Sequence, residues 1–309
     1  MLLSDATFHE PATLEAAADL LARFGAEAVL LAGGTDVLVD VKRGRFGAAH
    51  VVLLNRIAAL RGIASREDGI RIGALTTINQ LADCPIVRER FSVVLDATGK
   101  MAGPQVRNMA TAGGNLCNAN RCADLPPVFM VMGGSAVLWS RAGERSLPLE
   151  SFFLGQQQTA VRNGEILTEI VIPCPPQGFG AAFMRVGLRE SNAIAVAGSA
   201  ASLVLDEAGI VRNARIALSA VAPTPKLIEG AAALLAGRTL DEVSLTRAAA
   251  AAVEASDAIT DLRAQADYRR VLVGSLTRAA LVKARERAER ARVIKQQRRT
   301  VAGREMELS

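Results

Sequence analysis

The chain has 309 residues, of which 50% are hydrophobic and 22% charged, so it can bury a real core and disorder is not expected. Aromatic residues make up only 4%, which argues against a nucleic-acid platform built on base stacking. The net charge of +5 comes from the basic stretch after residue 278, and the rest of the chain is close to neutral. No apolar run is long enough to span a bilayer, and the N-terminus lacks the order of a secretory signal, so we expect a cytoplasmic protein.

The first sixty residues predict a small α/β unit. Thr13 is expected to cap a helix that ends at Gly25. A buried strand then delivers Gly33 and Gly34 to its carboxyl end, where ligands bind in strand–turn–helix layouts. No Gly-x-Gly-x-x-Gly occurs, so a Rossmann dinucleotide site is not indicated. The expected elements are a helix from Leu14, a strand over 29–31, a short helix over 37–41 and a strand over 51–54.

A second unit follows, with a glycine loop of its own. Residues 69–75 alternate like a half-buried strand, and Thr77 begins a helix that Pro85 breaks. The second loop reads Thr-Ala-Gly-Gly-Asn at 111–115 and follows a Gly-Pro pair at 103–104. The other elements expected are a helix over 87–98, an apolar segment over 128–132, a strand over 135–139, a loop over 145–149 and a strand over 164–173.

Prolines and glycines between residues 173 and 180 mark the clearest linker in the chain. Two paired strands over 193–205 and 210–218, two Ala-rich helices over 231–235 and 245–255, and a long helix from Leu276 are expected beyond it. We therefore divide the chain into domains 1–176 (subdomains about 1–60 and 61–176) and 177–285, with a basic helical tail over 286–309. The tail is either a solvated helix or a contact for a partner subunit or an acidic surface.

The two glycine loops carry the chemical signal. Adjacent glycines let backbone N–H groups approach a ligand closely, and successive N–H groups form a nest suited to phosphate. Each loop alone is more often a tight turn. Two such loops, each fed by an apolar segment, favour one diphosphate held between them.

Histidine and cysteine usage removes several kinds of catalytic site. His9 and His50 are the only histidines, so His-based triads and two-His metal sites are not expected. Cys117 and Cys122 have a spacing reminiscent of iron–sulfur ligation, but a cluster normally requires four thiolates, and Cys84 and Cys174 lie in separate segments. We expect free thiols and no metal site. Either a solvent-accessible thiol next to Arg121 has a lowered pKa and is reactive, or the side chains of Cys117 and Cys122 both pack beside a cofactor.

The loop sequences at 32–36 and 111–118, with Gly-Pro-Gln-Val-Arg-Asn at 103–108, resemble the FAD-binding middle subunit of the molybdenum hydroxylases. Leu-Thr-Glu-Ile-Val-Ile-Pro at 167–173 and Ala-Val-Ala-Pro-Thr-Pro at 220–225 resemble it too. The similarity covers roughly residues 1–285 in the family's order. It implies an α+β protein, with a two-subdomain FAD-binding fold of the vanillyl-alcohol-oxidase type followed by a C-terminal α+β domain. The family usually has small residues where this chain has Arg121 and Cys122.

The resemblance also implies the residues that bind FAD. Asp124 is either a helix cap or, as in relatives, a contact to the FAD, and Asp36 is a contact or a cap. Arg185 stands where the family often places a cation near the flavin, or is a surface cation. Ile166 and Leu167 would pack on the adenine, or are core residues. The residues expected at the FAD site are Leu30, Leu31, Ala32, Gly33, Gly34, Thr35, Asp36, Gly103, Thr111, Ala112, Gly113, Gly114, Asn115, Asp124, Leu167 and Arg185.

The function implied is that of an electron-transfer subunit with noncovalent FAD. Its partners would be a small subunit with [2Fe–2S] clusters and a large subunit with the molybdenum cofactor, as a dimer of heterotrimers, without nucleic acid or a membrane span. Electrons would pass between the clusters and an external acceptor or donor. The alternatives are a free-standing flavin oxidoreductase of the same fold, which would turn over substrate alone, and a non-catalytic nucleotide-binding scaffold whose basic tail binds nucleic acid.

Overall fold

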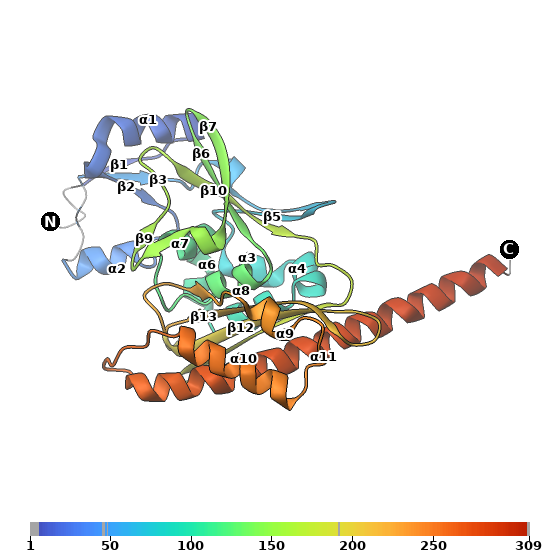
Figure 1. Cartoon of the computed structure of the whole chain (residues 1–309). Coiled ribbons are helices and arrows are strands. Elements are labelled where there is room, and N and C mark those ends of the chain that lie inside the picture. The colour runs from blue at the N-terminus through green and yellow to red at the C-terminus, as the bar shows by residue number, and fades with distance from the viewer. Residues whose placement is uncertain (1–5, 45–46, 48, 191, 308–309) are drawn as a thin grey trace.

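A computed structural model describes residues 6–44, 47, 49–190 and 192–307, with side chains as far as residue 292. Beyond that residue the side chains of the expected basic tail lie outside the described residues. An N-terminal part with two main sheets packs on a C-terminal part with one, and short helices lie between them (Figure 1). No helix in the described ranges combines the length with the apolar character that crossing a bilayer requires.

Three parallel strands form the first sheet, in the order β1-β3-β2. The Thr13 hydroxyl accepts a hydrogen bond from the Ala16 N–H at 3.2 Å and so caps the first helix, as predicted. The elements are β1 (Thr7–His9), α1 (Leu14–Phe24), a 3-10 helix (Gly25–Glu27), β2 (Ala28–Leu31), α2 (Val37–Lys42), β3 (His50–Leu53) and a second 3-10 helix (Ala58–Leu60). The glycine loop therefore joins the end of β2 to α2.

Five antiparallel strands form the second sheet, in the order β4-β5-β10-β6-β7. The strands are β4 (Ile63–Arg66), β5 (Gly69–Gly73), β6 (Ser135–Ser140), β7 (Gly143–Pro148) and β10 (Ile166–Pro173), with a 3-10 helix (Leu149–Ser151) and a separate pair β8 (Phe153–Gly155) and β9 (Gln158–Thr159). The helices are α3 (Ile78–Asp83), α4 (Pro85–Arg90), α5 (Val93–Thr98), α6 (Pro104–Met109), α7 (Ala112–Cys117) and α8 (Leu125–Val131).

The third sheet is antiparallel, in the order β11-β12-β13-β14, and α11 packs along β11 and β12. In Figure 1, α11 crosses beneath this sheet and its C-terminal half projects away from the body. The elements are β11 (Phe179–Gly187), β12 (Ala195–Leu205), β13 (Val211–Ser219), β14 (Lys226–Leu227), α9 (Ala231–Leu235), α10 (Glu242–Ala255) and α11 (Ala266–Glu307).

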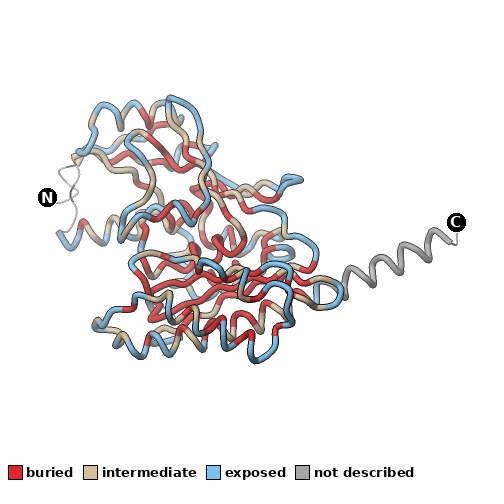
Figure 2. The backbone as a smooth tube through the Cα atoms, in the orientation of Figure 1, coloured by how far each residue is buried: buried red, intermediate tan, exposed pale blue. Residues whose placement is uncertain are grey.

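The largest core cluster joins the two parts of the molecule. It includes Phe129 and Val131 of α8 together with Phe183 of β11 and Ala200 of β12, all buried. Figure 2 shows the buried backbone continuing from the helical layer into the third sheet. The Ser202 hydroxyl also donates to the Val131 carbonyl at 2.7 Å inside this layer. The C-terminal part is therefore packed on the N-terminal part through a shared core.

Four sequence predictions need correction. Residues 145–149 belong largely to strand β7, because the segment pairs with β6. The helix expected over 87–98 is interrupted at Phe91 and Ser92, which separate α4 from α5. Strand β11 was not predicted, since Gly178 and Gly180 read as linker. The long helix begins at Ala266, ten residues before Leu276.

Candidate functional site

The first glycine loop leaves β2 with free backbone donors. Gly34 has a φ of +71°, a left-handed conformation that favours glycine, and it turns the chain into α2. Within the described ranges, the N–H groups of Gly33, Gly34, Thr35 and Asp36 donate to no protein acceptor. Consecutive free N–H groups in such a turn suit an anion, so this loop supplies the donors that a phosphate requires.

The second glycine loop uses its N–H groups within the protein. Thr111 caps α7, and its hydroxyl accepts from the Gly114 N–H at 3.0 Å. The Gly113 N–H donates to the Ala74 carbonyl at 2.9 Å, and a Cβ on Gly113 would lie 2.7 Å from that oxygen. The prediction of a second nest of free N–H groups is therefore wrong. The glycines here allow close packing of α7 on the end of β5.

The two loops nevertheless lie against each other, main chain to main chain. A Cβ on Gly33 would lie 1.9 Å from the Met109 carbonyl oxygen, a separation that real atoms do not reach. A Cβ on Gly114 would come within 4.0 Å of the Ala32 methyl. The fold thus brings together the two loops that were expected to share one ligand, and that they hold it stays a prediction.

Asp124 and Arg185 form a buried ion pair between the two parts of the molecule. An Arg185 Nη1–H donates to Asp124 Oδ2, and Nη2 donates to the Ala193 carbonyl. Both side chains are at most 5% exposed, so the reading of Arg185 as a surface cation is wrong. Burial raises the pKa of the Asp124 carboxyl to about 6, against the opposing attraction of Arg185. Asp124 also lies at the N-cap position of α8, but its side chain makes no capping hydrogen bond.

Several buried polar atoms of residues 115–124 have no hydrogen-bond partner in the described part of the chain. Asn115 Oδ1 and Asp124 Oδ1 are two unpaired acceptors, and Arg121 Nε and Nη2 are two unpaired donors. Buried polar groups in native proteins are normally paired with protein, water or ligand. Residues 115–124 therefore have the hydrogen-bonding capacity that a polar ligand such as FAD would satisfy, and the donor and acceptor set fits that cofactor.

Gly103 begins α6 and lies beside the loop that precedes β12. A Cβ on Gly103 would be 3.6 Å from the Asn192 side chain, and Asn192 has a φ of +52°. The guanidinium of Arg107 fixes the preceding turn by donating to the Met101 and Ala102 carbonyls at 2.8 and 3.1 Å. The Gly-Pro-Gln-Val-Arg-Asn motif thus holds the chain that leads into the second glycine loop.

The remaining residues that were expected to contact FAD are buried apolar residues and one carboxylate, Asp36. Leu31 and Leu167 are 8% and 5% exposed. Leu167 packs in the largest core cluster, whereas Ile166 belongs to the separate core around Val52 and Leu60. Asp36 occupies the N-cap position of α2 without a side-chain capping bond, so the cap reading is wrong for the described residues. Burial raises the pKa of the Asp36 carboxyl, and the charge of Asp40 adds to the effect.

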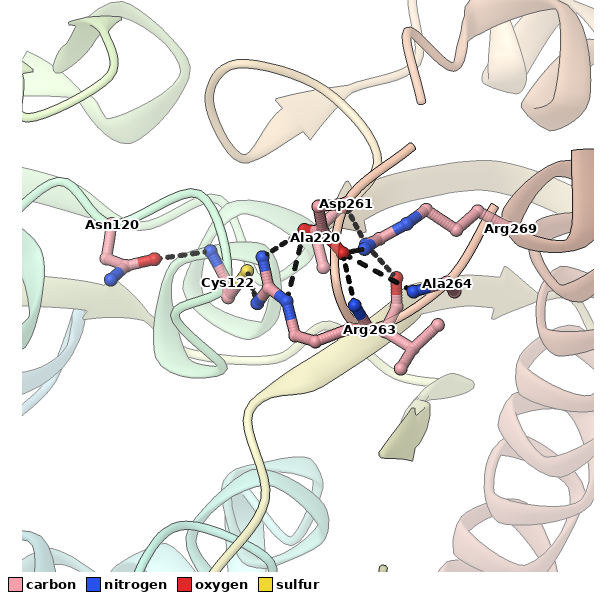
Figure 3. Close-up of polar contacts among 8 residues, drawn as sticks. Asn120, Cys122, Ala220, Asp261, Arg263, Ala264 and Arg269 are labelled. Atoms are coloured by element: carbon pink, nitrogen blue, oxygen red, sulfur yellow. Dashed lines mark hydrogen bonds and ion pairs between the residues drawn. The ribbon is translucent and has the colours of Figure 1, made fainter. Parts of the chain in front are cut away.

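The cysteines lie in different surroundings. Cys117 is an exposed residue, but the protein atoms around its thiol desolvate the thiolate and raise the pKa of the thiol to about 12. This raised pKa argues against a reactive thiolate at Cys117. Cys122 Sγ accepts from Arg263 Nη1 at 3.2 Å (Figure 3). The same guanidinium binds Asp261, which also holds the fully buried Arg269. This network ties residues 120–122 to the start of α11.

Sequence reasoning missed two residues in this region. Arg121 was noted only as a departure from the family pattern, although it is 8% exposed. Ser219, at the end of β13, has a buried hydroxyl without a partner in the described structure. The one signal in the sequence for Arg121 was that a long cationic side chain stands among the short side chains of residues 118–124.

Two family descriptions match the chain in sequence. The FAD binding domain in molybdopterin dehydrogenase matches residues 4–175, and the CO dehydrogenase flavoprotein C-terminal domain matches residues 182–284. The carbon monoxide dehydrogenase medium chain of Hydrogenophaga pseudoflava is 34% identical over 275 residues, covering 89% of this chain and 95% of the relative. A putative xanthine dehydrogenase FAD-binding subunit of Escherichia coli is 32% identical and covers 90% and 96%.

Solved structures agree with these sequence matches. Carbon monoxide dehydrogenase from Hydrogenophaga pseudoflava superposes with a TM-score of 0.88 at 34% identity, covering 91% of this chain and 98% of that chain. Quinoline 2-oxidoreductase from Pseudomonas putida 86 gives a TM-score of 0.85 at 27% identity, covering 93% and 98%. The mixed α+β fold is thus the one expected from the sequence.

Proposed function

This chain belongs to the FAD-binding medium subunits of the molybdenum hydroxylases, a family of oxidoreductases, and on that basis we propose that it relays electrons through a noncovalent FAD. The relay would run between an iron–sulfur subunit and an external acceptor or donor. Substrate chemistry would then take place on a large partner subunit that carries the molybdenum cofactor.

One structural observation carries the proposal: the two glycine loops interlock at Gly33 and Met109, and four N–H groups of the first loop have no acceptor in the part of the chain that the structure describes. In our proposal these N–H groups bind the diphosphate of FAD. Asn115 and Asp124, each with an unpaired buried oxygen, accept hydrogen bonds from the cofactor. No covalent attachment is proposed, because neither histidine lies at the loops: His9 and His50 hydrogen-bond to each other at 3.1 Å in the first sheet.

FAD, when bound, supplies the capacity to accept and release electrons. The chain itself provides position, charge and exclusion of water. The buried Asp124–Arg185 pair fixes the helical layer to β11, and the buried Leu31 side chain lies beside Gly34 of the first loop.

Flavin analysis of the purified chain tests the cofactor. Denaturation should release FAD, with little flavin left on the polypeptide, because the consecutive N–H groups of the first glycine loop suit a diphosphate and neither histidine lies at the loops. FMN in the supernatant, flavin retained on the chain, or a colourless protein that does not take up added FAD would each contradict the proposal.

Purification of the intact complex tests the relay. Flavin absorption together with iron–sulfur absorption and two further polypeptides is the expected result. Rapid reduction of the flavin by substrate in the complex, and none in the chain alone, would support a relay. Substrate turnover by the isolated chain would instead support a free-standing oxidoreductase.

A further inference from the structure

Arg121 is a buried cation without a counter-charge. The residue is 8% exposed, and its Nε and Nη2 atoms are buried with no hydrogen-bond partner among the described residues. It forms no ion pair with any described residue. A buried guanidinium without a partner is strongly unfavourable, so its retention points to an anionic group that meets it in the working protein.

The main chain of Arg121 is held at one end of the third sheet. Its carbonyl accepts from the Ala220 N–H at 2.7 Å. In the sheet, Ser219 pairs with Gly198, which pairs with Arg185 on the other side. Two strand spacings, roughly 10 Å, therefore separate Ser219 from Arg185. Arg121 lies at the same end of the sheet as the Asp124–Arg185 pair.

The neighbouring residue fixes this position further. Cys122 is held on one side by the Asn120 side chain, which accepts from its N–H at 2.9 Å, and on the other by Arg263 (Figure 3). The turn that carries Arg121 is thus tied to both parts of the molecule. The main chain that carries the Arg121 guanidinium is therefore positioned before any ligand arrives, which lowers the ordering cost of binding.

The position of Arg121 also indicates which anion it meets. Gly113 and Gly114 are the second and third residues of the six-residue helix α7, so roughly 5 Å of helix, from Gly114 to Cys117, precedes the turn that carries Arg121. A diphosphate bound at the glycine loops would lie at the opposite end of this helix. Asp124 is already neutralised by Arg185, and an acidic residue of a partner protein would not reach a side chain this deeply buried.

We propose that Arg121 is the counter-charge for the flavin end of FAD in its reduced state. The inference rests on the proposed FAD function and deepens it. Two electrons, supplied by the iron–sulfur centres of the proposed partner, and one proton from water leave the flavin with one additional negative charge. A fixed cation beside that charge stabilises the reduced cofactor over the oxidised one.

Affinity for the two redox states provides the test. In the full chain, Arg121→Gln should weaken binding of dithionite-reduced FAD about tenfold or more, while binding of oxidised FAD changes less than about threefold. For a two-electron couple each tenfold difference lowers the midpoint potential by about 30 mV, which dye-equilibrium titration measures. Arg121→Lys, which keeps the charge, should recover most of the difference.

A matched control removes a cation elsewhere. Arg212 lies near the hairpin at the other end of the sheet, is largely exposed and pairs with Asp206, so Arg212→Gln should leave the potential unchanged. Without cofactor, Arg121→Gln should raise the melting temperature, because the unpaired buried charge is gone.

Other results would overturn the inference. Equal weakening of both redox states would place the guanidinium at the diphosphate, and no change in either would remove it from the site; FAD binding by the wild type would still stand in both cases. A wild-type chain that binds no FAD would overturn the proposed function as well.

Discussion

At the scale of single residues, the molecule places charge where water does not reach it. Asp124 and Arg185 lie 61 positions apart in the chain and bind each other with both side chains almost fully buried. Such a pair contributes little net stability when intact, but removal of one partner leaves an uncompensated charge. The pair therefore fixes how the helical layer docks on β11 more than it adds to the free energy of unfolding.

Arg185→Gln should lower the free energy of unfolding of the cofactor-free chain by about 3–5 kcal/mol at pH 8. The loss should shrink on acidification. Burial already raises the Asp124 pKa to about 6, and without the Arg185 attraction it rises further, so protonation below that pH removes the unpaired charge.

Denaturant unfolding of both proteins at pH 8 and pH 5 provides the measurement. Arg212→Gln is the control and should cost less than about 1 kcal/mol at either pH, because the Arg212 side chain is 69% exposed. An equal loss for Arg185→Gln at both pH values would contradict the raised pKa of Asp124.

At the scale of elements, the two glycine loops show what a sequence can and cannot convey. Their composition predicted that the two loops would meet at one ligand. Strand β2, which precedes the first loop, lies where the sequence predicted it. The Gly114 N–H donates to Thr111 of the same loop, whereas the bond from the Gly113 N–H to the Ala74 carbonyl could not be read from the sequence, because that acceptor lies in a remote turn. The burial of Ser219 and Arg121 likewise could not be predicted, because it depends on the assembled third sheet.

Strand β11 illustrates the same limit. Its sequence begins within a glycine-rich stretch, and its nine residues are buried or half-buried, with none exposed and no polar alternation. Periodicity does not identify such a segment, since a fully buried strand lacks a solvent face. The position of Arg185 followed from the family resemblance, whereas its pairing with Asp124 is long-range and required the structure.

Gly33→Ala should disrupt the interlocked loops. The new methyl would meet the Met109 carbonyl, so the first loop must move, and we expect a loss of about 3 kcal/mol in the free energy of unfolding and much weaker FAD binding. Gly274→Ala in α11 is the control, because its Cβ would meet only the Val253 side chain at 3.4 Å. It should be neutral or slightly stabilising, as expected for alanine in a helix.

Denaturation curves and FAD titration of the two variants decide the matter. Full FAD occupancy in a normally stable Gly33→Ala protein would contradict the prediction that FAD binding requires the close contact between the two loops.

At the scale of the whole molecule, Asp96 connects the helical layer to the last helix. Its carboxylate accepts from Lys283 at 2.9 Å and from Arg287 at 2.6 Å, and it also accepts from the Phe183 N–H at 3.1 Å. Burial acts to raise the pKa of Asp96, but the hydrogen bonds and charges of Arg287 and Lys283 hold it below its ordinary value. One side chain thus secures α5, β11 and α11 together.

Asp96→Asn should lower the free energy of unfolding at pH 7 by about 2 kcal/mol, because two cations lose their partner. Since the folded-state pKa is depressed, the stabilisation is present above the ordinary value near 3.8 and is lost as the pH falls through the folded-state value. The variant should therefore differ less from wild type at pH 3 than at pH 7. Asp267→Asn, a change at an exposed i,i+3 pair, should alter stability by less than about 0.5 kcal/mol; a larger effect there than at Asp96 would contradict the assignment.

The bond between Arg287 and Asp96 spans 191 positions of the chain. During synthesis, α5 and β11 emerge long before the cations that hold them, so their shared surface must wait for the last helix. Contacts of such high sequence separation form late and slow the approach to the native state. If the proposed FAD site needs the loops, the helical layer and the third sheet in place, we expect FAD to bind only after the last helix has been synthesised and has docked.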